Sequence, residues 1–231
     1  MVNRETEKQI VARRAVAYVE DGMRVGLGSG TTAAYAIRFL GQRVRSEGLK
    51  IIGVPTSTGS RELAASCCIP LADDLAGFAL DLAIDGADQA TRAGELIKGA
   101  GGALLHERVV AGAARRFIVI GDSSKLAAHL GYVPLPVEVC PFGWRNALAR
   151  LEFHGCKASV RHNAGSPFVT EEGNYLLDCQ FPPEAFLRPA WLDQTIRTIP
   201  GVADHGLFLG MTDLLLIARG DEVEEIPTSR A

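Results

Sequence analysis

The sequence of 231 residues lacks the features of membrane-bound, secreted and nucleic-acid-binding proteins. Its longest uncharged apolar runs, such as Leu214–Ala218, fall far short of the roughly 18 residues that a membrane span needs. It has no basic block, and 24 Lys and Arg against 27 Asp and Glu give a net charge of −3, which disfavours binding to nucleic-acid phosphates. The amino-terminal segment carries charges where a signal peptide would need an apolar core. We therefore expect a cytoplasmic protein with neither a membrane nor a nucleic-acid partner.

Cysteine and histidine are also scarce. The five cysteines include one vicinal pair, Cys67 and Cys68, and no C-x-x-C, which argues against a disulfide framework and a zinc ribbon. The five histidines show no H-x-x-x-H or H-x-H spacing, and His154 and Cys156 have no second close pair to complete a ligand set. A G-x-S-x-G nucleophile elbow is absent as well. The sequence therefore predicts no metal site and no serine-hydrolase triad.

Glycine is abundant, with 25 residues, and many of the glycines lie in short turns between apolar segments. Up to position 120 the patterning predicts strands that alternate with helices. The expected strands are 23–27, 50–54, 78–84 and 117–120, and the expected helices are 5–20, 31–42, 60–66 and 103–113. Such alternation through short turns predicts an α/β fold, with a parallel sheet and helices on its faces.

The pattern changes near Tyr132. Strands at 137–140, 157–162, 174–181 and 205–209, with helices at 144–153 and 191–198, give the order βαββαβ of a ferredoxin-like α+β unit. The apolar segment Leu214–Ala218 is typical of a buried parallel strand that returns to the first sheet. We therefore expect one domain at 1–131 and 210–231, and an inserted ferredoxin-like domain at 132–209.

The first segment that could carry chemistry is Val25–Thr32. A strand there enters glycines, and hydroxyl residues then open a helix, so that several backbone N–H groups face an anion such as a phosphate. Gly28, Gly30 and Ala33 loosely fit a dinucleotide fingerprint, but the next strand ends in Gly53–Thr56 without the required acid, which disfavours a nicotinamide cofactor. The alternative is a plain strand-to-helix turn that Ser29 or Thr31 caps.

Three further segments follow predicted strands or glycine turns. Asp85 and Asp88 come at the carboxyl end of a strand, where they could bind sugar hydroxyls or move protons, or merely cap a turn. Lys98 could hold a developing oxyanion and Glu107 could act as a general base, unless Glu107 is an ordinary solvated helix residue. Lys125 could add positive charge near a phosphate, although a lone lysine after a strand is usually solvated.

Six stretches together carry a resemblance to a known family. They are GLGSGTT at 26–32, DGADQ at 85–89, KGAGGALLHE at 98–107, DSSK at 122–125, PLPVEV at 134–139 and IPGVADHGLF at 199–208. In this order they closely resemble ribose-5-phosphate isomerase, type A. That family has a Rossmann-like domain with a ferredoxin-like insertion, which is the architecture that the patterning predicts. The resemblance also suggests a homodimer or a homotetramer.

The resemblance implies roles for individual residues. Glu107 matches the proton-transferring carboxylate, Lys98 the lysine that stabilises the oxyanion, and Asp85 the aspartate assigned to opening the furanose ring. The positions that match substrate-binding residues are Ser29, Gly30, Thr31, Thr32, Asp85, Gly86, Ala87, Asp88, Lys98, Gly99, Ala100, Gly101, Lys125 and Lys8. Two departures are Gln89, where many members carry Glu, and an acidic tail after Asp221 to which we assign no role.

The chemistry of such a reaction suits these residues. An aldose and a ketose interconvert by a metal-assisted hydride shift or by proton transfer through an enediolate, and the sequence offers no metal cluster. We therefore expect D-ribose 5-phosphate and D-ribulose 5-phosphate to interconvert through an enediolate, without a cofactor. A sugar-phosphate-sensing regulator without turnover and an amino-sugar-phosphate deaminase remain alternatives.

Overall fold

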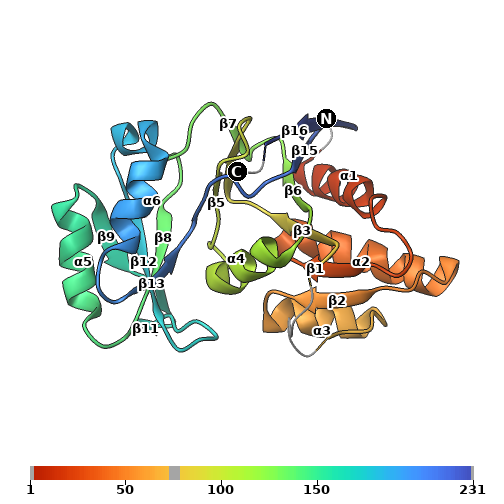
Figure 1. Ribbon diagram of the computed structural model, residues 1–231, viewed down its shortest axis with the longest axis horizontal. Helices are drawn as coiled ribbons and strands as arrows, with labels where there is room; N and C mark the ends of the chain where they lie inside the picture. Colours follow the sequence, from red (N-terminus) through yellow and green to blue (C-terminus); the bar gives the residue numbers. More distant parts are fainter. Residues whose placement is uncertain (1–2, 73–78, 230–231) are drawn as a thin grey trace.

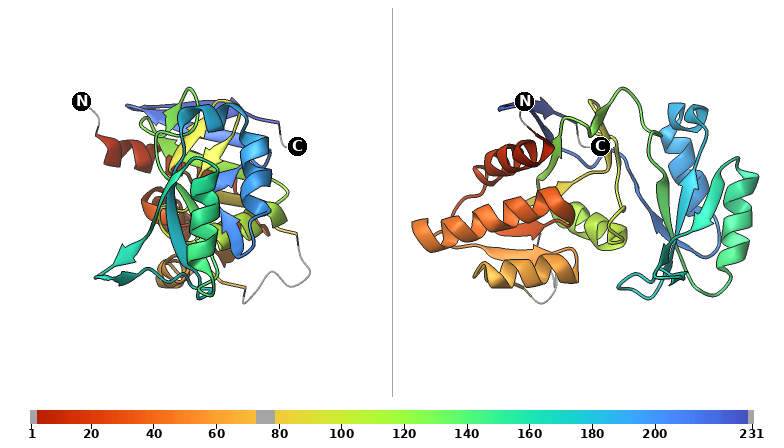
Figure 2. Two further views of the ribbon diagram at one scale, coloured as in Figure 1. Left: turned by 90° about the vertical axis from the view of Figure 1, so that its left-hand side faces the viewer. Right: turned by 180° about the vertical axis from the view of Figure 1, so that it is seen from behind.

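The computed structural model describes residues 3–72 and 79–229 (Figure 1). A six-stranded sheet with helices on both faces lies beside a four-stranded sheet, and two helices cover the outer face of the smaller sheet (Figure 2). Within these residues, no helix combines the length and the apolar character that crossing a lipid bilayer requires.

The six-stranded sheet has the order β16-β15-β6-β3-β1-β2. Its five parallel strands are β1 (Arg24–Leu27), β2 (Ile52–Pro55), β3 (Leu82–Gly86), β6 (Phe117–Asp122) and β15 (Leu214–Arg219). The parallel sheet is thus confirmed, and so is the return of 214–218 to it after the second sheet. The strand predicted over 78–84 is β3, and residue 78 lies outside the described residues.

Four helices cover this sheet: α1 (Arg4–Val16), α2 (Gly30–Glu47), α3 (Thr58–Ser66) and α4 (Leu104–Ala113). Successive strand side chains point to opposite faces, so one strand serves two cores. In β6, Ile118 and Ile120 pack in the core that includes α1 and α2, whereas Phe117 and Val119 pack with Val110 of α4 on the other face. This burial on both faces explains why the central strands read as continuous apolar runs.

The second sheet has the order β13-β8-β12-β9, with every neighbouring pair antiparallel. Its strands are β8 (Leu135–Val139), β9 (Lys157–Val160), β12 (Tyr175–Gln180) and β13 (Val202–His205). Helices α5 (Trp144–Phe153) and α6 (Pro189–Arg197) complete the βαββαβ order, which confirms the ferredoxin-like unit. Shorter elements are β10 (His162–Asn163), β11 (Ser166–Pro167) and the 3₁₀ helix Pro183–Leu187.

The position predicted for the last strand of this unit was wrong. Instead of one strand at 205–209, the chain forms β13 and then β14 (Leu207–Phe208), which belongs to a third, small sheet. That sheet has the order β14-β5-β4-β7 and contains β4 (Gln89–Thr91), β5 (Leu96–Ile97) and β7 (Leu126–Ala127). The change of sheet occurs at Gly206, whose N–H donates to Pro136 O at 2.7 Å and whose carbonyl accepts from Lys98 N–H at 2.8 Å.

The acidic tail is an edge strand of the first sheet. Strand β16 (Glu222–Pro227) pairs antiparallel with β15, and Glu225 accepts hydrogen bonds from Arg14 and Tyr18 of the segment that begins with α1. The division into 1–131 with 210–231 and 132–209 stays a prediction. The strands of the second sheet all lie inside 132–209. Strand β14 also lies inside this range, but its partner β5 lies outside it.

Candidate active site

A cavity of about 100 Å³ lies where β1 and β3 end and α2 and α4 begin. The residues that line it are Ser29, Gly30, Thr31, Thr32, Gly86, Ala87, Asp88, Lys98, Gly99, Ala100, Gly101, Glu107 and Lys125. The sequence predicted each of these as a site residue. In a parallel α/β sheet, the carboxyl ends of the strands are the usual place for a ligand. The fold therefore gathers turns that lie far apart in the sequence around one polar cavity.

Lys98 forms the centre of a buried charge cluster beside the cavity. Its Nζ lies 3.0 Å from Asp85 Oδ2 and 3.3 Å from Glu107 Oε2, and it donates a hydrogen bond to the carbonyl of Gly86. Asp85, Lys98 and Glu107 are 3%, 2% and 5% exposed. Two buried carboxylates thus share one ammonium group, so that the cluster holds one negative charge more than it can pair.

The pKa values follow from this imbalance. Burial raises the pKa of Glu107 to about 7, since the nearby Lys98 offsets only part of the desolvation and the charge of Asp85 adds to it. Burial also raises the pKa of Asp85, against the opposing effect of Lys98. For Lys98, burial lowers the pKa, but the charges of Asp85 and Glu107 outweigh it and raise the pKa overall. Lys98 therefore stays charged, and Glu107 can gain or lose a proton near neutral pH.

Asp85 lies behind the cavity wall and is not one of its lining residues. Its Oδ1 accepts hydrogen bonds from the N–H groups of Ser29 at 3.0 Å and Gly86 at 2.7 Å. This close approach requires glycine at position 28, because a Cβ there would lie 2.1 Å from Asp85 Oδ1. The aspartate thus links the turn after β1 to Lys98.

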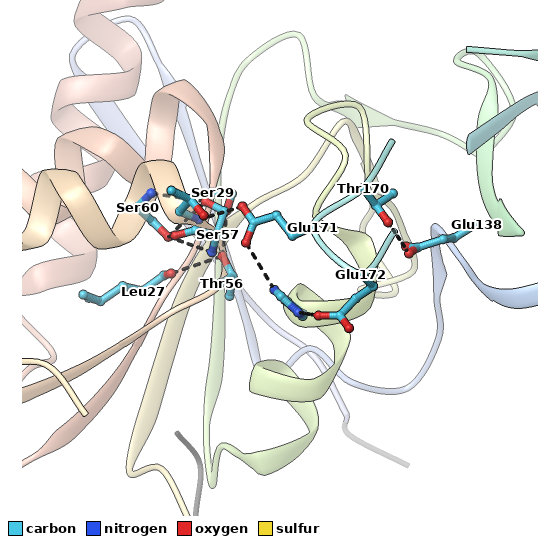
Figure 3. A network of polar contacts seen from close by, with 11 residues as sticks. Leu27, Ser29, Thr56, Ser57, Ser60, Glu138, Thr170, Glu171 and Glu172 are labelled. Atoms are coloured by element: carbon cyan, nitrogen blue, oxygen red, sulfur yellow. Dashed lines mark hydrogen bonds and ion pairs between the residues drawn. The ribbon is translucent and has the colours of Figure 1, made fainter. Parts of the chain in front are cut away.

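The hydroxyl of Ser29 points to the neighbouring turn after β2 (Figure 3). It lies 2.7 Å from Thr56 Oγ1 and donates to Ser57 Oγ at 2.8 Å. Ser29 is the N-cap residue of α2, yet its side chain does not cap the helix. Ser29 therefore links the turn after β1 to the turn after β2. The first turn of α2, which follows Ser29, lines the cavity.

The comparisons with known proteins decide the family. The model of the family "Ribose 5-phosphate isomerase A (phosphoriboisomerase A)" matches residues 52–222. This chain belongs to that family. It is 48% identical over 224 residues to the ribose-5-phosphate isomerase A of Sphingopyxis alaskensis, with 97% of each chain covered. It is equally identical over 232 residues to that of a Synechococcus strain, with 99% of this chain and 100% of the relative covered.

Solved structures of ribose 5-phosphate isomerases share the whole fold. A D-ribose-5-phosphate isomerase in complex with phospho-erythronic acid is 35% identical and superposes with a TM-score of 0.94, over 97% of this chain and 99% of that one. The ribose 5-phosphate isomerase A of Methanocaldococcus jannaschii is 37% identical, with a TM-score of 0.92 over the same shares. The resemblance in the six short stretches thus extends along the chain.

Lys8, like Asp85, was predicted to bind substrate but does not line the cavity, and unlike Asp85 it contacts none of the charged cluster. It lies on α1, where its Nζ pairs with Glu5 Oε2 at 3.2 Å. Gln89 is buried and holds the turn at 129–132: its amide donates to His129 O at 3.1 Å and accepts from Gly131 N–H at 3.0 Å. A glutamate could not donate in this way. No three His, Cys, Asp or Glu side chains in residues 3–72 and 79–229 are grouped so that they could hold a metal ion.

One supporting group was missed by the sequence reasoning. Arg108, the residue after Glu107, pairs with Asp204 and donates to the carbonyls of His205 and Leu207. Its guanidinium lies 4.1 Å from the ring centroid of Phe208, and Lys98 Nζ lies 5.7 Å from the same centroid. These contacts connect α4 to the IPGVADHGLF stretch. The signal that could have pointed to Arg108 was the IPGVADHGLF stretch itself. It matched the family, but the sequence analysis assigned no role to its residues.

Proposed function

We propose that this protein interconverts D-ribose 5-phosphate and D-ribulose 5-phosphate, a step of the non-oxidative pentose phosphate pathway. The observation that carries this proposal is Lys98 between two buried carboxylates, beside a polar cavity that the first turn of α2 and Lys125 also line. Membership of the isomerase family supports it. An assay of ribulose 5-phosphate formation from ribose 5-phosphate tests it. Turnover excludes a sensing regulator, and its absence together with ammonia release from an amino-sugar phosphate would favour a deaminase.

We assign the proton transfer to Glu107. Its carboxylate takes the proton from C2 of the open-chain aldose, and the electron pair moves into the C1–C2 bond, which leaves a negative charge on the C1 oxygen. Returning the proton to C1 and moving the hydroxyl proton from O2 to O1 gives the ketose, so that no atom or electron is gained or lost. A group with a pKa of about 7 can perform both steps near neutral pH.

We assign the stabilisation of the enediolate to Lys98. Its ammonium lies 3.3 Å from Glu107 Oε2. When Glu107 faces a substrate carbon, the oxygen bonded to that carbon or to its neighbour therefore lies close enough for Lys98 to stabilise its negative charge. The carbonyl of Gly86 and Asp85 hold this ammonium in place. Opening of the furanose ring by Asp85 stays a prediction. Asp88 lines the cavity directly and supports a role for this segment in contacting sugar hydroxyls.

The ionisation of Glu107 predicts a pH dependence. Because a protonated carboxyl cannot accept the C2 proton, kcat/KM should rise roughly tenfold per pH unit below the pKa of about 7 and level off above it. Initial rates at low substrate concentration across this range measure the profile. A kcat/KM that stays constant through neutral pH would contradict Glu107 as the base.

We place the phosphate at the first turn of α2 and Lys125. The N–H groups of a helix N-terminus and a cation together form a site for a dianion, and both line the cavity. The same chemistry suits the phospho-erythronic acid of the related complex. Whether Lys8 leaves Glu5 to reach this phosphate stays a prediction.

This placement predicts a strong preference for phosphorylated sugars. Losing the charged contacts of the phosphate should lower kcat/KM for free ribose at least about 10³-fold, since each charge-assisted hydrogen bond contributes about 1.5–3 kcal/mol. Parallel assays of ribose and ribose 5-phosphate measure the ratio, and phospho-erythronic acid should compete with the phosphorylated substrate. Comparable turnover of both sugars would contradict the phosphate site.

We further propose a cytoplasmic homodimer or homotetramer. The five cysteines are free thiols, as in a reducing compartment. Phe153 of α5 and Trp191 of α6 are 83% and 44% exposed, and the ring of His154 contacts both, at centroid distances of 5.5 and 6.4 Å. A continuous exposed aromatic cluster on the outer face of the second sheet supports contact with another copy of the chain.

A further inference from the structure

The turn Lys98–Gly102 forms one wall of the active-site cavity, and residues that flank the strands of the second sheet contact it. The N–H of Lys98 donates to the carbonyl of Gly206 at 2.8 Å. The ring of Phe168 lies so close to Gly102 that a Cβ there would be 2.5 Å from Phe168 Cζ. The turn carries Lys98 at one end and glycine at 99, 101 and 102, so its own torsions restrain it weakly. One hydrogen bond closes the turn from within, from Gly102 N–H to Gly99 O at 3.0 Å, and its other contacts come from groups outside it.

Arg161, which follows β9, makes the most direct of these contacts. Its Nη1 donates to the carbonyl of Gly99 at 3.0 Å and to the carbonyl of Ala100 at 2.9 Å. The rest of the guanidinium pairs with both oxygens of Asp178, with Nε 3.0 Å from Oδ2. The side chain of Arg161 is 17% exposed. One guanidinium thus joins the second sheet to two consecutive peptide groups of the turn.

The backbone of Arg161 is fixed as well. Its N–H donates to Leu176 O at 2.8 Å, and its carbonyl accepts from Phe168 N–H at the same distance. Asp178 lies on β12, two residues after Leu176. Both ends of the side chain are therefore held by the second sheet, which makes the guanidinium a rigid donor rather than a mobile surface charge.

The orientation of the turn follows from the trans peptide bond. In a trans peptide the C=O and the N–H point in opposite directions, so carbonyls that face Arg161 turn their N–H groups away from it. The N–H of Ala100 accordingly donates to Asp88 Oδ2 at 2.8 Å, and Asp88 lines the cavity. By the same geometry the N–H of Gly101 points away from Arg161. A rotated peptide would instead direct a carbonyl oxygen towards an anionic substrate.

We propose that Arg161 is a positioning residue of the active site. It holds the two peptide groups between residues 99 and 101 so that their carbonyls face Arg161. Their N–H groups then face Asp88 and the substrate. The proposal rests on the proposed isomerase function, because it assigns that activity a determinant of substrate binding outside the cavity. Arg161 itself touches no reacting atom.

Replacing Arg161 with Met should raise KM for ribose 5-phosphate about 10- to 100-fold, which corresponds to the loss of one charge-assisted hydrogen bond. The turnover number should fall less, since Asp85 and the Gly86 carbonyl hold the ammonium of Lys98 independently of Arg161. Asp178→Asn should shift KM in the same direction by a smaller factor. Arg145→Met removes an exposed guanidinium that stacks on Trp144 of the same unit, and it should leave both constants unchanged.

A rescue experiment separates positioning from general support of the fold. Millimolar guanidinium should restore part of the lost kcat/KM in Arg161→Ala, because the ion can occupy the space between Asp178 and the two carbonyls. Kinetic constants of Arg161→Met that match the wild type would overturn the proposal, and so would the absence of rescue. If the wild type does not isomerise ribose 5-phosphate, the proposed function fails instead. Calorimetric binding of phospho-erythronic acid to wild type and Arg161→Met then decides the positioning role alone.

Discussion

Replacing Glu107 with Gln should lower kcat by about 10²- to 10⁴-fold or more, with a much smaller change in KM. Glutamine keeps the shape of the side chain and its contact with the cavity but cannot accept a proton. Since the base acts in the transition state, binding of the ground-state sugar should survive. Steady-state kinetics of the variant and of Glu152→Gln, an exposed change on α5, measure the effect.

The same variant should be more stable than the wild type at pH 8. The folded pKa of Glu107, about 7, lies above its ordinary value of 4.5, so the folded state holds the proton more tightly. Its contribution to stability is complete below about pH 4.5 and is lost as the pH rises through 7, and by pH 8 the loss amounts to at most about 3 kcal/mol. Glutamine carries no charge to desolvate.

If Glu107→Gln is folded and has a normal kcat, Glu107 is not the base, and Asp85 or Asp88 takes that role.

Replacing Lys98 with Met should lower kcat at least about 10³-fold. The enediolate oxygen loses its ammonium, and removal of one oxyanion donor alone costs about 10²- to 10³-fold. In addition, Asp85 and Glu107 lose the cation between them, so the pKa of Glu107 should rise further and leave less of the base ionised at neutral pH. The acid limb of the kcat/KM profile should therefore move to higher pH in the variant.

Folding of Lys98→Met needs its own measurement. Breaking a buried ion pair costs about 3–5 kcal/mol when the remaining charge cannot neutralise, but here the carboxyls can take up protons. Stability should therefore fall more at pH 8 than at pH 6. Lys157→Met, on the exposed side of β9, is the matched control. A folded Lys98→Met variant with a kcat within about tenfold of the wild type would contradict the oxyanion role.

The course of the main elements could be predicted because each is encoded locally. Apolar runs such as Leu214–Ala218 must be buried on both faces, and this indicated a parallel sheet before any strand order was known. The small sheet could not be found in this way, since β5 and β14 have two residues each and pair across more than 100 positions. The turn at Gly206 depends equally on Lys98 and Pro136, far away in the chain.

The candidate site shows the same limit. Lys98 and Glu107 could be selected because a cation and an acid flank a glycine-rich turn, and the motif resemblance joined them to the turn after β1. Neither a glycine-rich turn nor an assigned family role singles out Arg108 or Arg161 in the sequence. Their contacts with Asp204 and with the Gly99 and Ala100 carbonyls link segments about 60 to 100 residues apart, and only the folded chain brings them together.

Hydrogen exchange at carbon during turnover in deuterated water tests the central claim most directly. In the enediolate mechanism the proton that Glu107 removes can exchange with water before it returns to carbon. Ribose 5-phosphate formed from ribulose 5-phosphate by the wild type should therefore carry deuterium at C2, and the Glu107→Gln variant should incorporate almost none. Isomerisation by the wild type that leaves C2 free of solvent deuterium would indicate a direct hydride shift and contradict the account.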